Sequence, residues 1–476
     1  MTINAVLFDD DLLHIFDYYV AGAQQKWCTL VSVCQRWRKI VYGSPHRLNL
    51  RIFCTSRTPV RTKLDDWPAL PIVISVDLYD PYYNHDNIKA ALERNERVSE
   101  INLPTWGIGF NVLAALEKPF PVLTGLTLRF TGYPNSIFPD PDKFLGGSNR
   151  LRSLSLSLMP ITELPKLLLS FTDLVDLRLD HVPIMGQFSP KAIIASLSAL
   201  TRLGTFHFNL KSDQFRHWEH QPLPPPTRAV LPSLTMLEFE GRKEYFEGFI
   251  AGIDAPLLDH LSMTLHCFDF QVTGNLILIG TEQTVQFISL VPKFQALDEV
   301  HIGIDNVKST VSIEFLSDGG PGGSVTALKV VIPCDEPERE FPYLARFCRS
   351  PFFPLLGLKD LYIEIIDNGE FKGFSRERWL YDAERTRLLQ LLRPFTSVKN
   401  LHLPKNLARR IAPVLKELGG EIATAVPTLH QENRIFLKLA AFLSIILDYL
   451  ITLCVALASC FLRCLEGLVD SIERRF

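Results

Sequence analysis

The sequence predicts an α/β fold in three parts: a short helical unit, an irregular solenoid of repeated strands, and an apolar C-terminal helix. Three observations carry this prediction. Two stretches with helical periodicity lie in the first fifty residues, an apolar pattern returns eleven times between residues 98 and 403, and the composition becomes far more apolar after residue 435. The 476 residues also exceed what one compact core usually holds, which agrees with an elongated architecture.

The helical unit is expected to contain two amphipathic helices. Asp10 or Asp11 can cap the first helix, and apolar residues within 12–19 then recur at steps of three or four. After a break at residues 21–23, apolar residues within 27–41 follow the same rhythm and predict a second helix. Two helices of this size cannot make an independent core, so a partner or a following domain must cover their apolar surface.

Residues 7–50 resemble an F-box, on the elements LFDDDLLHIF, WCTLVSVCQRWRKIV and SPHRLNL in this order. The family usually places proline after the first leucine, and Phe8 stands there in this chain. F-box proteins use this helical hairpin to dock on the small adaptor subunit of Skp-cullin-F-box ubiquitin ligases. The resemblance implies that this interface is formed or supported by Leu7, Leu12, Leu13, Ile15, Phe16, Leu30, Val33, Cys34 and Trp37. The alternative is that the hairpin merely packs on the downstream domain, because an apolar stripe at helical spacing is more often core.

Residues 52–71 are expected to be a linker. Pro59, Pro68 and Pro71 disfavour helix there, whereas Ile72, Val73 and Ile74 begin the first buried strand of the next domain. The stretch also resembles the segment that follows the F-box in a large group of such proteins from mushroom-forming fungi. The expected division is therefore residues 1–51 for the F-box, 52–71 for the linker, 72–430 for the solenoid and 431–476 for the apolar helix.

The repeated pattern is an apolar residue, two others, an apolar residue, one other and an apolar residue. Its matches start at Val98, Leu123, Leu151, Leu174, Leu203, Leu234, Leu258, Leu297, Val325, Leu358 and Val398. Each match indicates a short strand whose alternate residues point inward, after an inward residue at the preceding turn. Such units bury a face only against their neighbours, so they must stack.

The array resembles a degenerate leucine-rich-repeat solenoid. An Asn or Cys ladder is not evident, and several intervals exceed the usual repeat length of about 20–29 residues. Long insertions at residues 131–147, 221–227 and 317–323 are rich in Pro or Gly and are expected as loops. A stacked array would present parallel strands on a concave wall suited to binding another protein. The alternative is an ordinary α/β domain whose buried strands begin with leucine.

Charge and motifs argue against other functional classes. The 49 Lys and Arg nearly cancel the 52 Asp and Glu, so no nucleic-acid partner is expected. The nine cysteines lack paired CxxC spacing, and no phosphate loop, HExxH or nucleophile-elbow motif occurs, so no metal, cofactor or enzymatic activity is expected. The most suggestive polar cluster, HWEH at residues 217–220, is expected to be a solvated loop.

The C-terminal segment leaves three interpretations open. Residues 439–462 carry Asp448 as their one formal charge and are long enough to cross a bilayer as a helix. A stripe of small or polar residues instead favours an amphipathic helix whose apolar face packs on the last repeat and caps the solenoid. The third interpretation is a gene-model error. Because three aspartates stand where a secretory signal needs a basic start, the cytoplasm or nucleus is expected, with membrane association through residues 439–462 as the alternative.

Taken together, the sequence predicts a substrate-recognition subunit of a Skp-cullin-F-box ligase. The N-terminal hairpin would dock on the ligase adaptor, and the repeat surface would bind an unknown protein target and hold it near a catalytic site on other subunits. One alternative is a membrane-tethered repeat scaffold without a ligase role. Another is an enzyme, which would require a deep polar pocket with perturbed ionisable groups.

Overall fold

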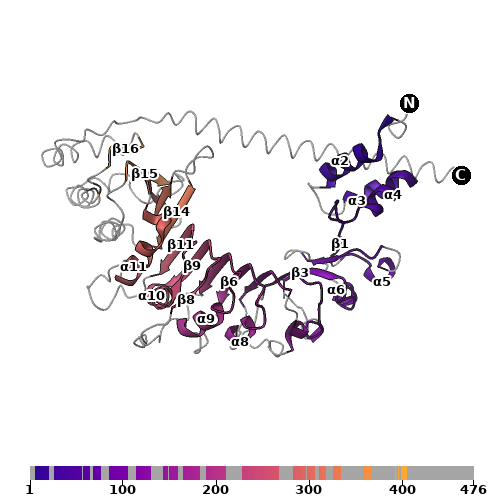
Figure 1. Cartoon of the computed structure of the whole chain (residues 1–476), viewed down its shortest axis with the longest axis horizontal. Helices are drawn as coiled ribbons and strands as arrows, with labels where there is room; N and C mark the ends of the chain where they lie inside the picture. Colours follow the sequence, from indigo (N-terminus) through magenta and orange to yellow (C-terminus); the bar gives the residue numbers. More distant parts are fainter. Residues whose placement is uncertain are drawn as a thin grey trace, which may run out of the picture.

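The computed structural model describes most of the chain up to residue 404. The described residues are 6–20, 26–55, 57–64, 68–76, 85–104, 114–129, 143–147, 150–158, 164–182, 189–210, 228–266, 282–295, 297–305, 310–317, 325–333, 358–366, 392, 395 and 398–404. Within them, strands line the inner side of a curved α/β array, helices lie along its outer side, and three helices stand at its N-terminal end (Figure 1).

The first helix of the N-terminal unit, α2, spans Asp9–Val20. It begins there because the Asp11 carboxylate accepts the backbone N–H of Phe8 at 3.0 Å, while Phe8 O accepts the N–H of Leu12 at 3.1 Å. A carboxylate in the first turn that reaches back in this way is one half of a capping box. Asp11 therefore caps the helix, as expected, but from inside its first turn.

The second expected helix is two helices, so the prediction of one continuous helix was wrong. α3 spans Lys26–Val33 and α4 spans Gln35–Gly43, and Cys34 between them is extended, with φ −161° and ψ 169°. The break frees carbonyl groups at the end of α3. The Arg38 Nε–H donates to one of them, Val31 O, at 2.9 Å. Apolar periodicity marks the inner face and cannot report such a break, because the face continues across it.

The three helices share their core with the start of the sheet. The Phe16 ring of α2 is fully buried and lies 4.8 Å from the Trp37 ring of α4. Trp27 of α3 is also buried, and its indole N–H donates to Arg51 O at 2.8 Å, directly before the first strand. Part of the apolar surface of the helical unit is therefore covered by the rest of the chain.

Fourteen strands of the described chain form one sheet. In spatial order they are β1 (Ile52–Cys54), β2 (Ile72–Ser75), β3 (Val98–Pro104), β4 (Gly125–Arg129), β5 (Ser153–Ser157), β6 (Asp176–Val182), β7 (Thr205–Leu210), β9 (Met236–Arg242), β11 (His260–His266), β14 (Val325–Pro333), β13 (Thr310–Ser317), β12 (Glu299–Asp305), β15 (Asp360–Ile366) and β16 (Asn400–His402). Neighbours are parallel except at β13, which is antiparallel to both β12 and β14. A separate parallel pair joins β8 (Ala229–Val230) to β10 (Ile253–Asp254).

The strands predicted from the apolar pattern are confirmed. All eleven matches place their central apolar residue on a strand of the sheet. Apart from half-buried Val398, every apolar member whose side chain is described is buried. Adjacent units are also joined through their backbones before each strand. Thr124 O, for example, accepts the N–H groups of Arg152 at 2.8 Å and Ser153 at 3.0 Å, and Arg152 O accepts those of Val175 and Asp176 in turn.

The order of two units differs from the expected order along the chain. β11 pairs with β14, and β12 comes only after β13. Four residues, 306–309, separate β12 from β13, which is too short for a parallel crossover of about a dozen residues or more, so the two strands form an antiparallel pair. β14 then returns antiparallel to β13. The eighth and ninth matches therefore exchange places in the sheet.

Helices and turns cover the outer side of the sheet. They are α5 (Val60–Lys63), α6 (His85–Leu92), η1 (Phe144–Gly147), α8 (Leu164–Leu168), α9 (Pro190–Leu197), α10 (Lys243–Ala251), α11 (Glu282–Leu290) and η3 (Pro292–Gln295). The core lies between these elements and the sheet. In α9, Pro190 occupies the first turn and the Ser189 hydroxyl accepts the N–H of Ala192 at 3.2 Å, which fixes the start of the helix.

Part of the segment expected to be a linker has regular structure. Residues 52–54 form β1, which pairs in parallel with β2, and residues 60–63 form the short helix α5 directly after Pro59. Proline disfavours the interior of a helix but not the position before it. The expected strand at Ile72, Val73 and Ile74 is confirmed as β2.

Two expectations lie outside the described residues. These are the HWEH cluster at 217–220 and the whole apolar segment 431–476, including the candidate membrane span 439–462. Among the described residues, no helix combines the length and apolar character that crossing a membrane requires.

Candidate recognition surfaces

One face of the sheet carries the core, and the opposite, concave face carries polar side chains in rows. Because the strands pair in register, equivalent positions of successive units stand side by side. One row runs through Thr127, Ser155, Arg178, His207, Glu238, Ser262, Lys329, Glu314, His301, Tyr362 and His402. The repeat therefore builds a continuous polar surface across ten neighbouring strand pairs.

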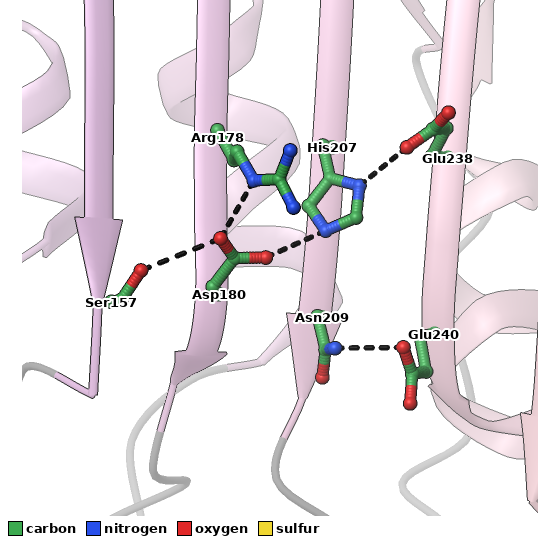
Figure 2. Close-up of polar contacts among 7 residues, drawn as sticks. All are labelled: Ser157, Arg178, Asp180, His207, Asn209, Glu238 and Glu240. Carbon is green, nitrogen blue, oxygen red and sulfur yellow. Dashed lines mark hydrogen bonds and ion pairs between the residues drawn. The ribbon is translucent and has the colours of Figure 1, made fainter. Parts of the chain in front are cut away.

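His207 of β7 lies between two carboxylates in this surface. Its Nδ1 is 2.6 Å from Glu238 Oε2 on β9, and its Nε2 is 2.7 Å from Asp180 Oδ1 on β6 (Figure 2). An ionised carboxylate cannot donate a proton, so a ring with a carboxylate oxygen within 2.7 Å of each nitrogen is matched best by the form that carries a proton on both. The geometry therefore favours the imidazolium form.

The environment of His207 shifts its pKa in the same sense. Burial of the ring lowers this pKa, but the hydrogen bonds to Asp180 and Glu238 outweigh burial and raise it above its ordinary value. Burial likewise raises the pKa of Asp180, and its bonds to His207 and Arg178 reverse the shift, so the net pKa is lowered. Asp180 and His207 are thus held as an ion pair on the face of the sheet.

Arg178 and Ser157 complete the contacts of Asp180. Arg178, two residues earlier on β6, donates from Nε to Asp180 Oδ2 at 2.6 Å, and the Ser157 hydroxyl of β5 donates to the same oxygen at 3.4 Å (Figure 2). The pairing of β6 with β7 loses register after Leu179, and His181 has a φ of 51° in this irregular stretch. Asp180 thus stands where the strand departs from regular pairing.

A second polar contact lies one row further along the same strands. Asn209 donates from Nδ2 to Glu240 Oε2 at 2.7 Å (Figure 2), and the His266 Nε2 lies 3.4 Å from Glu240 Oε1. The interaction with His266 lowers the pKa of Glu240, although burial opposes it. Glu240 is therefore an ionised carboxylate beside Glu238.

Between these strands and β13 lies a hollow of about 380 Å³. Its lining residues are His207, Glu238, Phe239, Glu240, His260, Ser262, Thr264, Glu314, Thr326 and Lys329. The hollow forms because β11 presents small hydroxyl side chains, Ser262 and Thr264, between the longer side chains of neighbouring strands. On the far wall, Lys329 and Glu314 form an ion pair at 2.6 Å.

The contacts of His207 differ from those of a catalytic triad. A catalytic triad places an imidazole between a carboxylate and a nucleophile, whereas both nitrogens of His207 face carboxylates and Ser157 contacts Asp180 instead. Within the described residues, no group of three or more His, Cys, Asp or Glu is arranged to hold a metal ion. Burial raises the pKa of the Cys54 thiol to about 12, which keeps this cysteine protonated.

The nine residues implied in adaptor docking fall into three groups. Leu12, Leu13, Phe16 and Leu30 are buried in the chain's own core, and Leu7, Cys34 and Trp37 are half-buried. Ile15 and Val33 are exposed, at 49% and 54%. The structure brings Phe16 and Trp37 into contact, and the surface contribution of this set comes mainly from its exposed members.

Exposed apolar side chains gather on the helical unit. Of the twelve large apolar side chains that the described residues leave exposed, seven lie between residues 6 and 42. They are Val6, Phe8, Ile15, Tyr18, Tyr19, Val33 and Tyr42. Phe8, at the position where the F-box family usually has proline, is 80% exposed. The helical unit therefore has a more apolar surface than the rest of the described chain.

Comparisons with known proteins add little to these observations. No family model matches the chain, and no curated protein matches it. Among solved structures, the chain is similar to the leucine-rich repeat-containing protein LegL7 from Legionella pneumophila, with 12% identity and a TM-score of 0.27 over 72% of this chain and 96% of that one. The resemblance of residues 7–50 to an F-box therefore stays a prediction.

The polar cluster on β6, β7 and β9 was missed at the sequence level, although a signal for it exists. In each unit the residue between the last two apolar positions faces away from the core. Aligning the eleven units by their apolar positions brings Arg178, His207 and Glu238 to equivalent sites in consecutive units. Which of their atoms meet depends on strand register, which the pattern alone does not give.

Proposed function

We propose that the chain is a protein-recognition adaptor with two binding surfaces. The N-terminal helices dock on the small adaptor subunit of a Skp-cullin-F-box ligase, and the concave face of the sheet binds a protein target. The chain performs no chemistry itself and acts by raising the concentration of the target near a ligase. The observation that carries this proposal is the gathering of exposed apolar side chains on residues 6–42.

Exposure of this kind favours docking over simple packing. Isolated apolar side chains are ordinary on a protein surface, whereas seven of the twelve exposed ones on one small unit support an interaction site there. The buried members of the implied set support the helices from inside. Ile15 and Val33 then provide the accessible apolar surface that another polypeptide can cover.

The concave face supplies the second half of the proposal. Its rows of charged and hydroxyl side chains stand opposite the buried apolar rows, in the manner of a stacked repeat whose inner wall binds a protein. The alternative of a membrane-tethered scaffold depends on residues 439–462, which lie outside the described part of the chain.

The experiment is capture of the ligase adaptor by the full-length chain. The test variant is Ile15→Ser with Val33→Ser, because these side chains are exposed and their loss leaves the core intact. We expect adaptor binding to weaken roughly tenfold or more, as for loss of central apolar contacts in an interface. Substituting Leu12, Phe16 or Trp37 is less informative, since buried or half-buried positions also support the fold.

The matched control is Leu169→Ser with Leu290→Ser, two side chains that are each 52% exposed on the outer elements of the repeat region. This control should capture as much adaptor as the natural chain. Equal capture by all three chains, or no capture by the natural chain, contradicts docking through the helical unit.

A further inference from the structure

The hollow on the concave face differs in charge between its two walls. On the β13 and β14 side, Glu314 and Lys329 neutralise one another at 2.6 Å. On the β9 side stand Glu238 and Glu240, two residues apart on one strand, so their side chains leave the same face about 7 Å apart along it. The fixed negative charge therefore lies on one wall.

The Glu238 carboxylate keeps one oxygen for a ligand, whereas Glu240 contacts Asn209 through Oε2 and His266 through Oε1 and can accept a further hydrogen bond only through its remaining lone pairs. Glu238 uses Oε2 for His207, and its Oε1 has no hydrogen-bond partner among the described residues. The side chains of Glu238 and Glu240 are 35% and 40% exposed, so both can be reached from the solvent. Among the charged residues of the lining, the three carboxylates of Glu238, Glu240 and Glu314 outnumber Lys329 and the His207 imidazolium by one.

The size and floor of the hollow narrow the choice of occupant. A volume of about 380 Å³ lies at the low end of the ~300–1,000 Å³ of small-ligand sites, so one or two side chains fit better than a large cofactor. The floor offers the hydroxyl groups of Ser262, Thr264 and Thr326, which both donate and accept hydrogen bonds. This lining suits the stem and head of a long polar side chain.

We propose that the hollow receives a lysine or arginine side chain of the target protein, with its cationic head held by Glu238 and Glu240. The inference rests on the proposed function, in which the concave face binds a protein target. His207 acts as a positioning residue, because its Nδ1 contact with Glu238 (Figure 2) fixes a carboxylate that lines the hollow. Asn209 holds Glu240 in the same way.

The test is selection of a displayed library of random twelve-residue peptides on the full-length chain. Three chains are compared: the natural chain, Glu238→Gln with Glu240→Gln, and the control Asp176→Asn with Glu364→Gln. The control removes two exposed carboxylates from β6 and β15 that lie on the same face but outside the hollow. Thermal unfolding first establishes that all three chains fold.

Selection on the natural chain should enrich peptides with Lys or Arg at one position. Selected peptides should bind the Glu238→Gln, Glu240→Gln chain roughly five- to twentyfold more weakly and the control chain equally well. Enrichment without a basic residue, retained binding by the first variant, or equal loss in the control overturns the cation site while leaving target binding by the concave face in place. If the natural chain enriches no peptide, binding of a protein target by the concave face is contradicted as well. Docking of the N-terminal helices on the ligase adaptor is tested separately, by the capture experiment.

Discussion

The helical unit and the repeat sheet use the same kind of sequence pattern with opposite results at the surface. In the sheet, the apolar residues of the repeat are sealed and polar side chains take the outward positions. In the helices, the periodic stripe is divided: Leu12 and Phe16 are buried, whereas Ile15 and Tyr19 remain exposed. Periodicity thus identifies a face, and only the packing around it decides whether that face is core or docking surface.

The difference has a structural origin. The strands between the two edge strands, β1 and β16, have neighbours on both sides, and the outer helices and turns lie over the core face, so an apolar position there is covered. The three N-terminal helices stand at one end of the array, where fewer of the described elements cover them (Figure 1). Apolar residues of these helices that do not face the shared core, such as Ile15 and Val33, therefore stay at the surface.

The largest expected effect is the loss of a sealed aromatic side chain in the sheet. Phe206 is fully buried. Its ring centroid lies 5.6 Å from that of Phe208, in a stacked arrangement, and 5.8 Å from that of Phe249. We expect Phe206→Ala to lower the free energy of unfolding by about 3–5 kcal/mol in a denaturant titration. Phe8→Ala, at an 80% exposed position of the helical unit, should change it by less than about 0.5 kcal/mol. Similar losses for both would erase the contrast between the two regions.

Removal of His207 should have an intermediate effect. His207→Leu leaves Asp180 and Glu238 without the cation that joins them, although Arg178 still contacts Asp180. We expect the free energy of unfolding to fall by about 1–3 kcal/mol. His266→Leu is the comparison, because its contact with Glu240 is longer, at 3.4 Å, and its cost should be smaller. A larger cost for His266→Leu would mean that the bridged imidazolium does not stabilise the sheet.

The contribution of His207 should also depend on pH. Its pKa is raised in the folded chain, so its stabilisation is complete below the unfolded value of about 6.5 and is lost as pH rises through the folded value. The neighbouring charges are Arg178, Asp180, Glu238 and Glu240, and both Asp180 and Glu240 stay ionised throughout because their pKa values are lowered. The difference in unfolding free energy between the natural chain and His207→Leu should therefore shrink between pH 6 and pH 9. A difference that grows over this interval contradicts the raised pKa.

The smallest expected effect concerns the ion pair at the start of the helical unit. Arg36 of α4 donates to Leu7 O at 2.8 Å and pairs with Asp9 at 2.6 Å, where Asp9 is 65% exposed. Arg36→Met should lower the free energy of unfolding by no more than about 1 kcal/mol, and the difference should diminish in concentrated salt. A cost above about 2 kcal/mol would show that the helical unit depends on this contact far more than an exposed ion pair allows.

The sequence predicted the strands well because a repeated apolar pattern has one physical outcome. Leu154, Leu177 and Phe206 each lie on a strand and point into the core, as their spacing requires. The helices of the N-terminal unit were predicted for the same reason. Alternation of apolar residues is a local property, and local properties can be read without knowing the neighbours.

The remaining features depend on contacts between distant residues. The exchange of β12 and β14 in the sheet follows from the insertion of β13, a strand that does not match the repeated apolar pattern. The break between two helices at Cys34 leaves the apolar face unchanged, so the spacing of apolar residues does not predict it. The pairing of His207 with Glu238 requires β7 and β9 to lie in register, and its pairing with Asp180 requires the irregular end of β6 beside β7; these partners are 31 and 27 residues away in sequence. Likewise, nothing in the sequence separates buried Phe16 from exposed Ile15, since both lie on the predicted stripe.

Hydrogen–deuterium exchange of the full-length chain with and without the ligase adaptor tests the division of roles most directly. If the helical unit is the docking surface, protection should increase in residues 6–43 and stay unchanged in the strands from β3 to β16. Protection confined to the concave strands, or no change anywhere at saturating adaptor, would contradict the assignment of docking to the N-terminal helices.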